Sequence, residues 1–279
     1  MLKSEIVALE MAARRAEEEG DYEAALRAWR SLALETGSAA SHCQIGRVAK
    51  ELENWIEAEK AFLDALSVDS HLAIPMLSLG SLYLSRADGD RSGNAKTAKT
   101  WLLRAMEIDR NASGMSLLGT AHHYLGEISA ARQAYHTAIG LDSFYEEAYF
   151  NLGILEEEQG NHAEAETLLR RSIQLDPCRA GAHGRLGLLL HKQGNYSEAE
   201  SEFRRCVELD PSDYFSHLYL ANNLGVQGRE AEAEQEFRAA IAIRPGEEPA
   251  IKLFANYLDS LFRIEEAAQW RFQLSRKPN

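Results

Sequence analysis

Two short segments carry residue types that bind metal ions in other proteins, and neither has the spacing that a metal site needs. His122 and His123 are adjacent, whereas a metal-binding histidine pair on a helix is spaced i, i+4. The segment Asp88-x-Asp90-x-Ser92-Gly93 begins like a calcium loop. Such a loop needs an acidic bidentate ligand six residues after the glycine, and Lys99 stands there. We therefore predict no metal site and no cofactor.

The sequence also lacks the common catalytic motifs. It contains no G-x-S-x-G, P-loop or dinucleotide-binding motif. No Ser/His/Asp or Cys/His set converges at the spacings present. The three cysteines, Cys43, Cys178 and Cys206, are an odd number without close pairing, which favours a reducing compartment over a disulfide framework. These observations predict that the chain is not an enzyme.

The elements that carry these residues recur with a period of about 34 residues, which is within the range of helical repeat proteins. Leu152, Leu186 and Leu220 are 34 residues apart. Pro177, Pro211 and Pro245 keep the same spacing. A small residue such as Gly153 is also followed by an alanine at a fixed distance that recurs along the chain. Self-similarity at a fixed period indicates one supersecondary unit stacked many times. It favours a long binding surface over a catalytic pocket.

One register runs through the whole chain and predicts a single domain, 1–279, without a linker. It gives eight repeats: 6–38, 39–72, 73–111, 112–145, 146–179, 180–213, 214–247 and 248–279. The third repeat holds six extra residues. They fall in the turn-forming segment 87–94, which we expect to be a flexible insertion loop.

Each repeat is predicted to be a pair of antiparallel helices. In 146–159 and 163–175 the apolar residues recur at helical spacing. Gly160 ends the first helix and Asp176-Pro177 the second, since the residue before a proline is disfavoured in the α region. We expect Gly153 to lie against Ala165 and to let the two helices approach closely.

The string Tyr149-x-x-Leu152-Gly153, with Ala165, Leu169 and Pro177 after it, resembles the tetratricopeptide repeat (TPR) family. The resemblance extends from about Ile6 to about Arg276 and is closest over 180–213. It implies an all-α fold, a right-handed α-solenoid of about eight helix-turn-helix repeats in roughly one superhelical turn. First helices would line an inner groove and second helices the outer face. The last repeat departs from the pattern, because Arg271 takes the place of Phe203 and Phe237.

Three histidines share one column of the repeat. His42, His183 and His217 stand where Tyr149 stands in the fifth repeat. We interpret them as flat, medium-sized side chains that fill a slot between helices.

The net charge of the chain is −13, which does not favour nucleic-acid binding. By the geometry of the family, six groove cations, among them Arg185 and Lys192, face eight acidic residues that include Glu157. No run approaches 18 apolar residues and the first residues lack a signal-peptide core. We therefore expect no membrane insertion and a cytoplasmic location.

The resemblance also selects the candidate binding residues. They combine apolar and aromatic contacts with a few amide and cationic groups, which suits an extended peptide. The candidates are Phe150, Asn151, Ile154, Arg185, Leu188, Lys192, Leu218, Tyr219, Asn222 and Asn256. Some family members clamp a C-terminal carboxylate with five residues. Only Asn151 and Arg185 match that clamp, because Ser116, Thr120 and Gly181 replace the others.

We therefore expect a protein-interaction scaffold that binds an extended peptide segment of a partner protein in the groove. One alternative is a structural solenoid that self-associates through its terminal repeats into a homo-oligomer. Another is the interaction or regulatory part of a larger assembly or enzyme.

Overall fold

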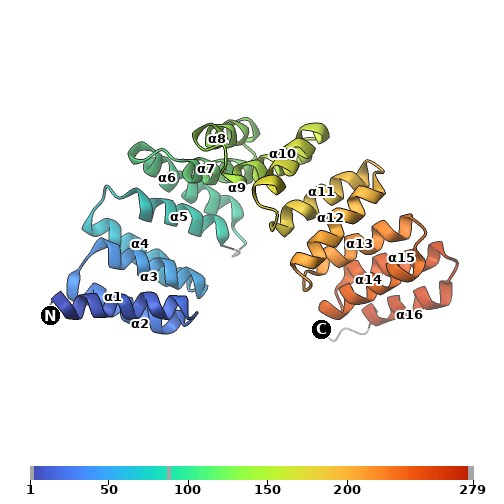
Figure 1. The fold of residues 1–279 in the computed structure, drawn as a ribbon, viewed down its shortest axis with the longest axis horizontal. Helices are drawn as coiled ribbons and strands as arrows, with labels where there is room; N and C mark the ends of the chain where they lie inside the picture. Colours follow the sequence, from blue (N-terminus) through green and yellow to red (C-terminus); the bar gives the residue numbers. More distant parts are fainter. Residues whose placement is uncertain (1–2, 87–88, 276–279) are drawn as a thin grey trace. The chain divides into compact units, whose positions relative to one another are not determined.

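The structure is a computed structural model that describes residues 3–86 and 89–275. These residues form sixteen helices and no strand (Figure 1). The helices are α1 (Lys3–Glu18), α2 (Tyr22–Thr36), α3 (Ala39–Glu51), α4 (Trp55–Val68), α5 (Ala73–Ser85), α6 (Arg91–Ile108), α7 (Ala112–Tyr124), α8 (Ile128–Leu141), α9 (Glu146–Glu158), α10 (His162–Leu175), α11 (Ala180–Lys192), α12 (Tyr196–Leu209), α13 (Tyr214–Val226), α14 (Glu230–Ile243), α15 (Glu248–Ser260) and α16 (Ile264–Ser275). The expected fold class, an all-α solenoid of helical hairpins, is confirmed.

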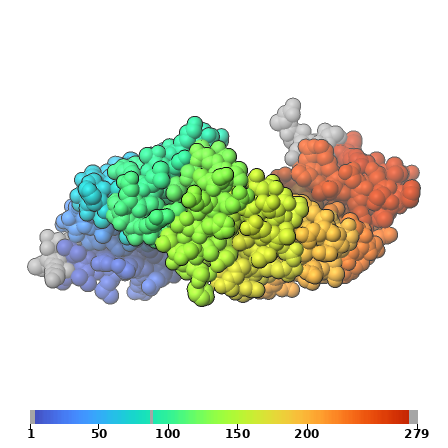
Figure 2. Space-filling view, turned by 90° about the horizontal axis from the view of Figure 1, so that it is seen from above, coloured from blue at the N-terminus to red at the C-terminus, as the bar shows by residue number. Residues whose placement is uncertain are grey.

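The chain divides into two compact bodies, and the division falls inside α9. The N-terminal body comprises 1–151 and the C-terminal body 152–279. Within each body, successive helical hairpins lie side by side in chain order (Figure 2). The odd-numbered helices from α3 to α15 begin at the residues where the sequence register starts each repeat. That the whole chain forms one domain stays a prediction.

The insertion in the third repeat is largely helical, so the expected loop is wrong for residues 91–94. Helix α6 begins at Arg91 and is 18 residues long, compared with 14 for α4 and α8. The Asp90 carboxylate caps this helix by accepting a hydrogen bond of 2.9 Å from the Gly93 amide. Asp90 thus serves as a helix cap. Ala87 and Asp88, the other end of the expected loop, lie outside the described residues.

An aspartate ends the second helix of several repeats in the same way. The carboxylates of Asp69, Asp142, Asp176 and Asp210 each accept a hydrogen bond of 2.9 or 3.0 Å from the amide two residues further on. The aspartate itself takes a non-helical backbone conformation. Such Asx turns compete with the helix for the backbone. They therefore end helices that have no proline after them, as at Asp142.

The two helices of a hairpin approach each other where the first helix carries glycine. A Cβ atom on Gly187 would lie 2.7 Å from the nearest atom of the Phe203 ring, and one on Gly119 would lie 2.5 Å from that of Tyr135. The glycine therefore faces the large side chain of the second helix. The alanine one turn before that side chain, such as Ala199, is fully buried beside it. The seventh repeat has Ala221 at the position of this glycine, and its core still contains the equivalent large side chain, Phe237.

In the last hairpin the aromatic side chain of the second helix comes from the position one residue earlier in the sequence. Arg271 points to the surface, where its guanidinium donates to Asn256 Oδ1 at 2.9 Å and to Asp259. Trp270 instead packs against Phe254, with ring centroids 5.2 Å apart. The substitution of arginine in the aromatic column is therefore compensated by its neighbour.

Ion pairs run along the second helices of the C-terminal body. Arg170 pairs with Glu166 on its own helix and with Glu198 on α12, at 3.0 and 2.8 Å. Arg204 repeats this with Glu200 and with Glu232 on α14, at 2.9 and 3.0 Å. Each pair is half-exposed and contributes little on its own. Together they connect one hairpin to the next, and we call them the outer ladder.

The close approach at glycine predicts opposite effects for two substitutions on α11. Gly187→Ala places a methyl group against the Phe203 ring and should lower the free energy of unfolding by about 1–3 kcal/mol. Gly184→Ala meets only the Cys206 sulfur, at an ordinary 3.5 Å, and should raise it by up to about 1 kcal/mol through helix propensity. Urea unfolding of both variants measures the difference. Equal effects would contradict the packing described here.

Candidate functional site

The C-terminal body carries a hollow on the side formed by its first helices. It has a volume of about 490 Å³ and lies between α11 and α13, with α12 beneath. Its lining is Ala180, Gly181, Gly184, Arg185, Leu188, Cys206, Asp210, Asp213, Phe215, Ser216 and Tyr219. The hollow exists because the first turns of α11 carry small residues, so no side chain fills the space opposite α13.

Stacked aromatic rings form one wall of the hollow. Phe215 and Tyr219 are one helical turn apart on α13, and their rings stack at 6.2 Å between centroids and 22° between planes. Tyr219 stacks in turn on the buried Phe203, at 6.0 Å and 29°. Because the Tyr219 ring stacks on both Phe215 and Phe203, it has little conformational entropy to lose on binding. This wall is therefore preorganised for an apolar or flat group.

The floor of the hollow is a buried thiol. Cys206 Sγ donates to the Ala180 carbonyl at 3.2 Å and accepts a hydrogen bond from Ser216 Oγ at 2.9 Å. Burial raises the pKa of this thiol. It is therefore a poor nucleophile and acts as a small core residue, in the column that holds Ala240 in the next repeat.

Arg185 supplies positive charge at the rim, and a buried carboxylate partly neutralises it. The Glu157 side chain is only 6% exposed and meets Arg185 Nη1 at 3.5 Å and Lys192 Nζ at 2.8 Å. The Arg185 side chain is 40% exposed and is the more loosely held of the two cations. Glu157, a predicted groove acid, thus binds two of the predicted groove cations, a contact that the repeat pattern does not predict.

The structure brings three of the predicted residues together and places the others elsewhere. Arg185, Leu188 and Tyr219 line one hollow. Leu218 is 3% exposed and packs in the core, so its assignment to the groove surface is wrong: it points between helices. The remaining candidates are partly exposed or paired: Ile154 is half-buried, Lys192 binds Glu157, Asn222 lies 3.3 Å from the His191 ring, and Asn256 accepts from Arg271.

Phe150 and Asn151 belong to the N-terminal body, where both are half-buried. This body has an inner hollow of its own, of about 400 Å³, lined by residues of α3, α4, α5, α7 and α9. The candidate residues did not include it. The sequence feature that could have indicated this hollow is a set of small residues at groove positions, namely Ser78, Ser81 and Ser113. Among the described residues that line this hollow, Lys50 is the one cation outside an ion pair. It donates a hydrogen bond to Ser81 Oγ at 2.8 Å.

Known family profiles match the central part of the chain. Two profiles, both described as tetratricopeptide repeat, match residues 116–180 and 180–213. The second match has the bounds of the sixth repeat. Residues 116–213 are tetratricopeptide repeats. No curated protein matches its sequence.

Solved TPR-like structures share the fold. One comes from a functional characterization of PilF from Pseudomonas aeruginosa, with 24% identity over 75% of this chain and 92% of that chain, at a TM-score of 0.64. Another is a chain of the APC/C hetero-tetramer Cut9-Hcn1, with 16% identity over 91% of this chain and 46% of that chain, at a TM-score of 0.72. At these identities the likeness concerns the fold alone.

The TPR column of histidines has a more specific role than filling a slot. His183 Nδ1 bonds to Glu202 Oε2 at 2.6 Å, and Nε2 lies 3.2 Å from the Pro177 carbonyl. His217 repeats both contacts with Glu236 and Pro211, at 2.6 and 3.1 Å. Tyr149 donates to the Ser143 carbonyl at 3.2 Å. These side chains tie the start of a TPR hairpin to the end of the preceding one.

The His122 ring, which belongs to the adjacent histidine pair, contacts a glutamate. Its Nδ1 bonds to Glu127, and hydrogen bonds from Lys99 and His122 lower the pKa of Glu127. Among the described residues, no three His, Cys, Asp or Glu side chains gather in a way that could hold a metal ion. In the same part of the chain, no helix combines the length and apolarity that crossing a membrane requires.

The His183 contacts predict a stability that depends on pH. The bond to Glu202 raises the pKa of His183, against the effect of burial, and the Pro177 carbonyl adds to the rise. Only the protonated ring can donate to both acceptors. Its contribution is therefore complete below the unfolded pKa of about 6.5 and is lost as pH rises through the higher folded pKa. Glu202→Gln should cost about 1.5 kcal/mol at pH 5.5 and much less at pH 8.5.

Thermal unfolding of wild type and Glu202→Gln at both pH values measures this. Glu198→Gln is the matched control, since this exposed carboxylate lies on the same helix and pairs with Arg170 instead of His183. A destabilisation by Glu202→Gln that is the same at both pH values would rule out the protonated pair.

Proposed function

We propose that this protein is a protein-interaction scaffold that binds an extended peptide segment of a partner in its inner groove. The hollow between α11 and α13 is the observation that carries the proposal: it joins an open space, a stacked aromatic wall and a half-exposed cation. The TPR repeats support an interaction scaffold in general. The absence of catalytic motifs from the sequence favours binding over catalysis.

The peptide would place an apolar or aromatic side chain in the hollow, against Phe215 and Tyr219. Arg185 would bind a carbonyl or carboxylate oxygen next to that side chain. A carboxylate would compete with Glu157 for Arg185, while Lys192 keeps Glu157 neutralised at 2.8 Å. The arrangement thus lets Arg185 change partner without leaving a buried charge unpaired.

We also propose the cytoplasm as the location. Cys43, Cys178 and Cys206 are free thiols, and Cys178 is exposed, which suits a reducing compartment.

Self-association through the terminal repeats is a second proposal, which the last hairpin favours. Phe262 is 90% exposed and takes a positive φ of 60°, where most other repeats carry glycine, and Ile264 is also exposed. An aromatic residue in this strained and solvated position suggests an interaction role.

Filling the hollow should abolish partner binding without unfolding the chain. Gly184→Leu extends an aliphatic side chain from the lining of the hollow, and Arg185→Glu with Tyr219→Ala removes the cation and the ring. Affinity capture from the native source, followed by titration of the captured partner, should show a loss of roughly tenfold or more for both variants. Gly140→Leu is the matched control, because its Cβ position faces open space on α8.

Retained binding in Gly184→Leu, at unchanged helicity and melting temperature, would remove the hollow from the proposal. Sedimentation of the purified protein tests the second proposal independently. Self-association should increase with protein concentration and weaken in Phe262→Gly, whereas a monomer at high concentration would argue against it.

A further inference from the structure

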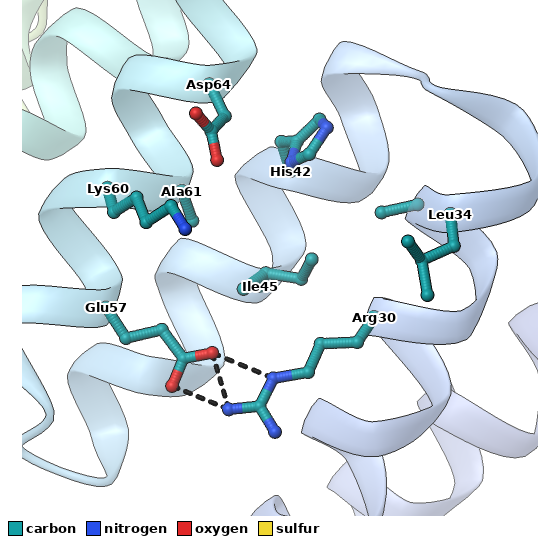
Figure 3. Close-up of a pocket in the computed structure, with 9 residues that line it drawn as sticks. Arg30, Leu34, His42, Ile45, Glu57, Lys60, Ala61 and Asp64 are labelled. Atoms are coloured by element: carbon teal, nitrogen blue, oxygen red, sulfur yellow. Dashed lines mark hydrogen bonds and ion pairs between the residues drawn. The ribbon is translucent and has the colours of Figure 1, made fainter.

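A second hollow lies on the other side of the N-terminal body. It has a volume of about 510 Å³ and is bounded by the second helices α2 and α4, with α3 between them. Figure 3 shows Lys60 and Asp64 of α4 on one side, Leu34 of α2 on the other, and His42 and Ile45 of α3 in the middle. It belongs to the outer face and shares no residue with the proposed peptide groove.

His42 has lost the partner that the other histidines of its column possess. His183 and His217 each bond to a glutamate 19 residues later, Glu202 and Glu236, at 2.6 Å. The residue at the equivalent position after His42 is Ala61, which also lines the hollow. In the described part of the chain the His42 ring makes no hydrogen bond. The hollow thus occupies the place where two other repeats hold a carboxylate.

The charges around the hollow leave room for one more carboxylate. Arg30 donates to Glu57 through Nε and Nη2, at 2.8 and 2.5 Å, so its charge is already neutralised by Glu57. Lys60 and Asp64 enter none of the ion pairs found among the described residues. The hollow therefore holds two positive and two negative side chains, and Lys60 is the cation without a partner in this part of the structure. Asp64 is the one group that opposes an incoming anion.

The rest of the lining is apolar. Leu34 is 88% exposed at the rim, and the buried Ala33 and Ile45 lie below it. A large aliphatic side chain in water at this position gains from contact with a partner's aliphatic group. The hollow therefore combines an aliphatic surface with an unpartnered imidazole and an unpartnered ammonium group.

We propose that this hollow binds an acidic segment of a partner protein. A glutamate side chain of that segment replaces the missing carboxylate and bonds to His42, as Glu202 bonds to His183. Lys60 binds the same carboxylate, and a neighbouring aliphatic residue packs on Leu34. The chain would then have one binding site in each body, of different chemistry and on different faces.

The test follows the His42 ring by ¹⁵N NMR in the full chain labelled at its nine histidines, with His42→Gln to assign the signal. The probes are the blocked peptides acetyl-Leu-Glu-Leu-amide and acetyl-Leu-Gln-Leu-amide. We expect the glutamate peptide to shift the His42 resonances saturably and the glutamine peptide to leave them in place. His183 and His217, whose rings already bind glutamates, are internal controls and should not respond.

Three variants make the result decisive. Ala61→Glu supplies the carboxylate internally, so the ring should lose its response to the peptide. Lys60→Met should weaken binding about fivefold and Asp64→Asn should strengthen it, and both changes are at accessible positions that leave the core intact. No response in the wild type, an equal response to the glutamine peptide, or binding that Lys60→Met strengthens and Asp64→Asn weakens would overturn the proposal.

Discussion

The close approach of two helices at a glycine is the contact on which the architecture of this protein depends. In five repeats the first helix carries a glycine whose Cβ would lie 3.0 Å or less from the large side chain on the second helix, such as Phe62 or Tyr135. The ring or leucine fills the space of the absent methyl group, which fixes the distance and the rotation of the two helices. Groove and outer face follow from that rotation, because it decides which residues point between helices and which point away.

The periodicity of the sequence was sufficient to predict the hairpins and their order. Side-chain direction was harder to predict, because a column in a repeat does not say how far a residue is turned toward the neighbouring helix. Leu218 was therefore assigned to the surface although it is buried. Contacts between repeats were also missed. Glu157 meets Arg185 and Lys192 at separations of 28 and 35 residues, and no spacing rule within one repeat connects them.

Repetition also provides comparisons inside one molecule. Position for position, His183 and His42 occupy the same site of the fold, and they differ because one faces Glu202 and the other Ala61. The insertion shows the opposite case, since the extra residues of the third repeat are absorbed by a longer helix and leave Leu102 packed on Gly80. Departures from the period therefore have to be judged by the contacts that they keep or lose.

The outer ladder has a mechanical consequence for the C-terminal body. Its arginines connect neighbouring hairpins through half-exposed carboxylates, as Arg170 does with Glu198 and Arg204 with Glu232, while the tightest core contacts lie within a hairpin. Dissolved ions screen such surface bridges far more than they affect buried apolar packing. A higher ionic strength should therefore weaken these links between adjacent hairpins, while the apolar packing within and between hairpins, such as that of Phe237 on Phe254, persists.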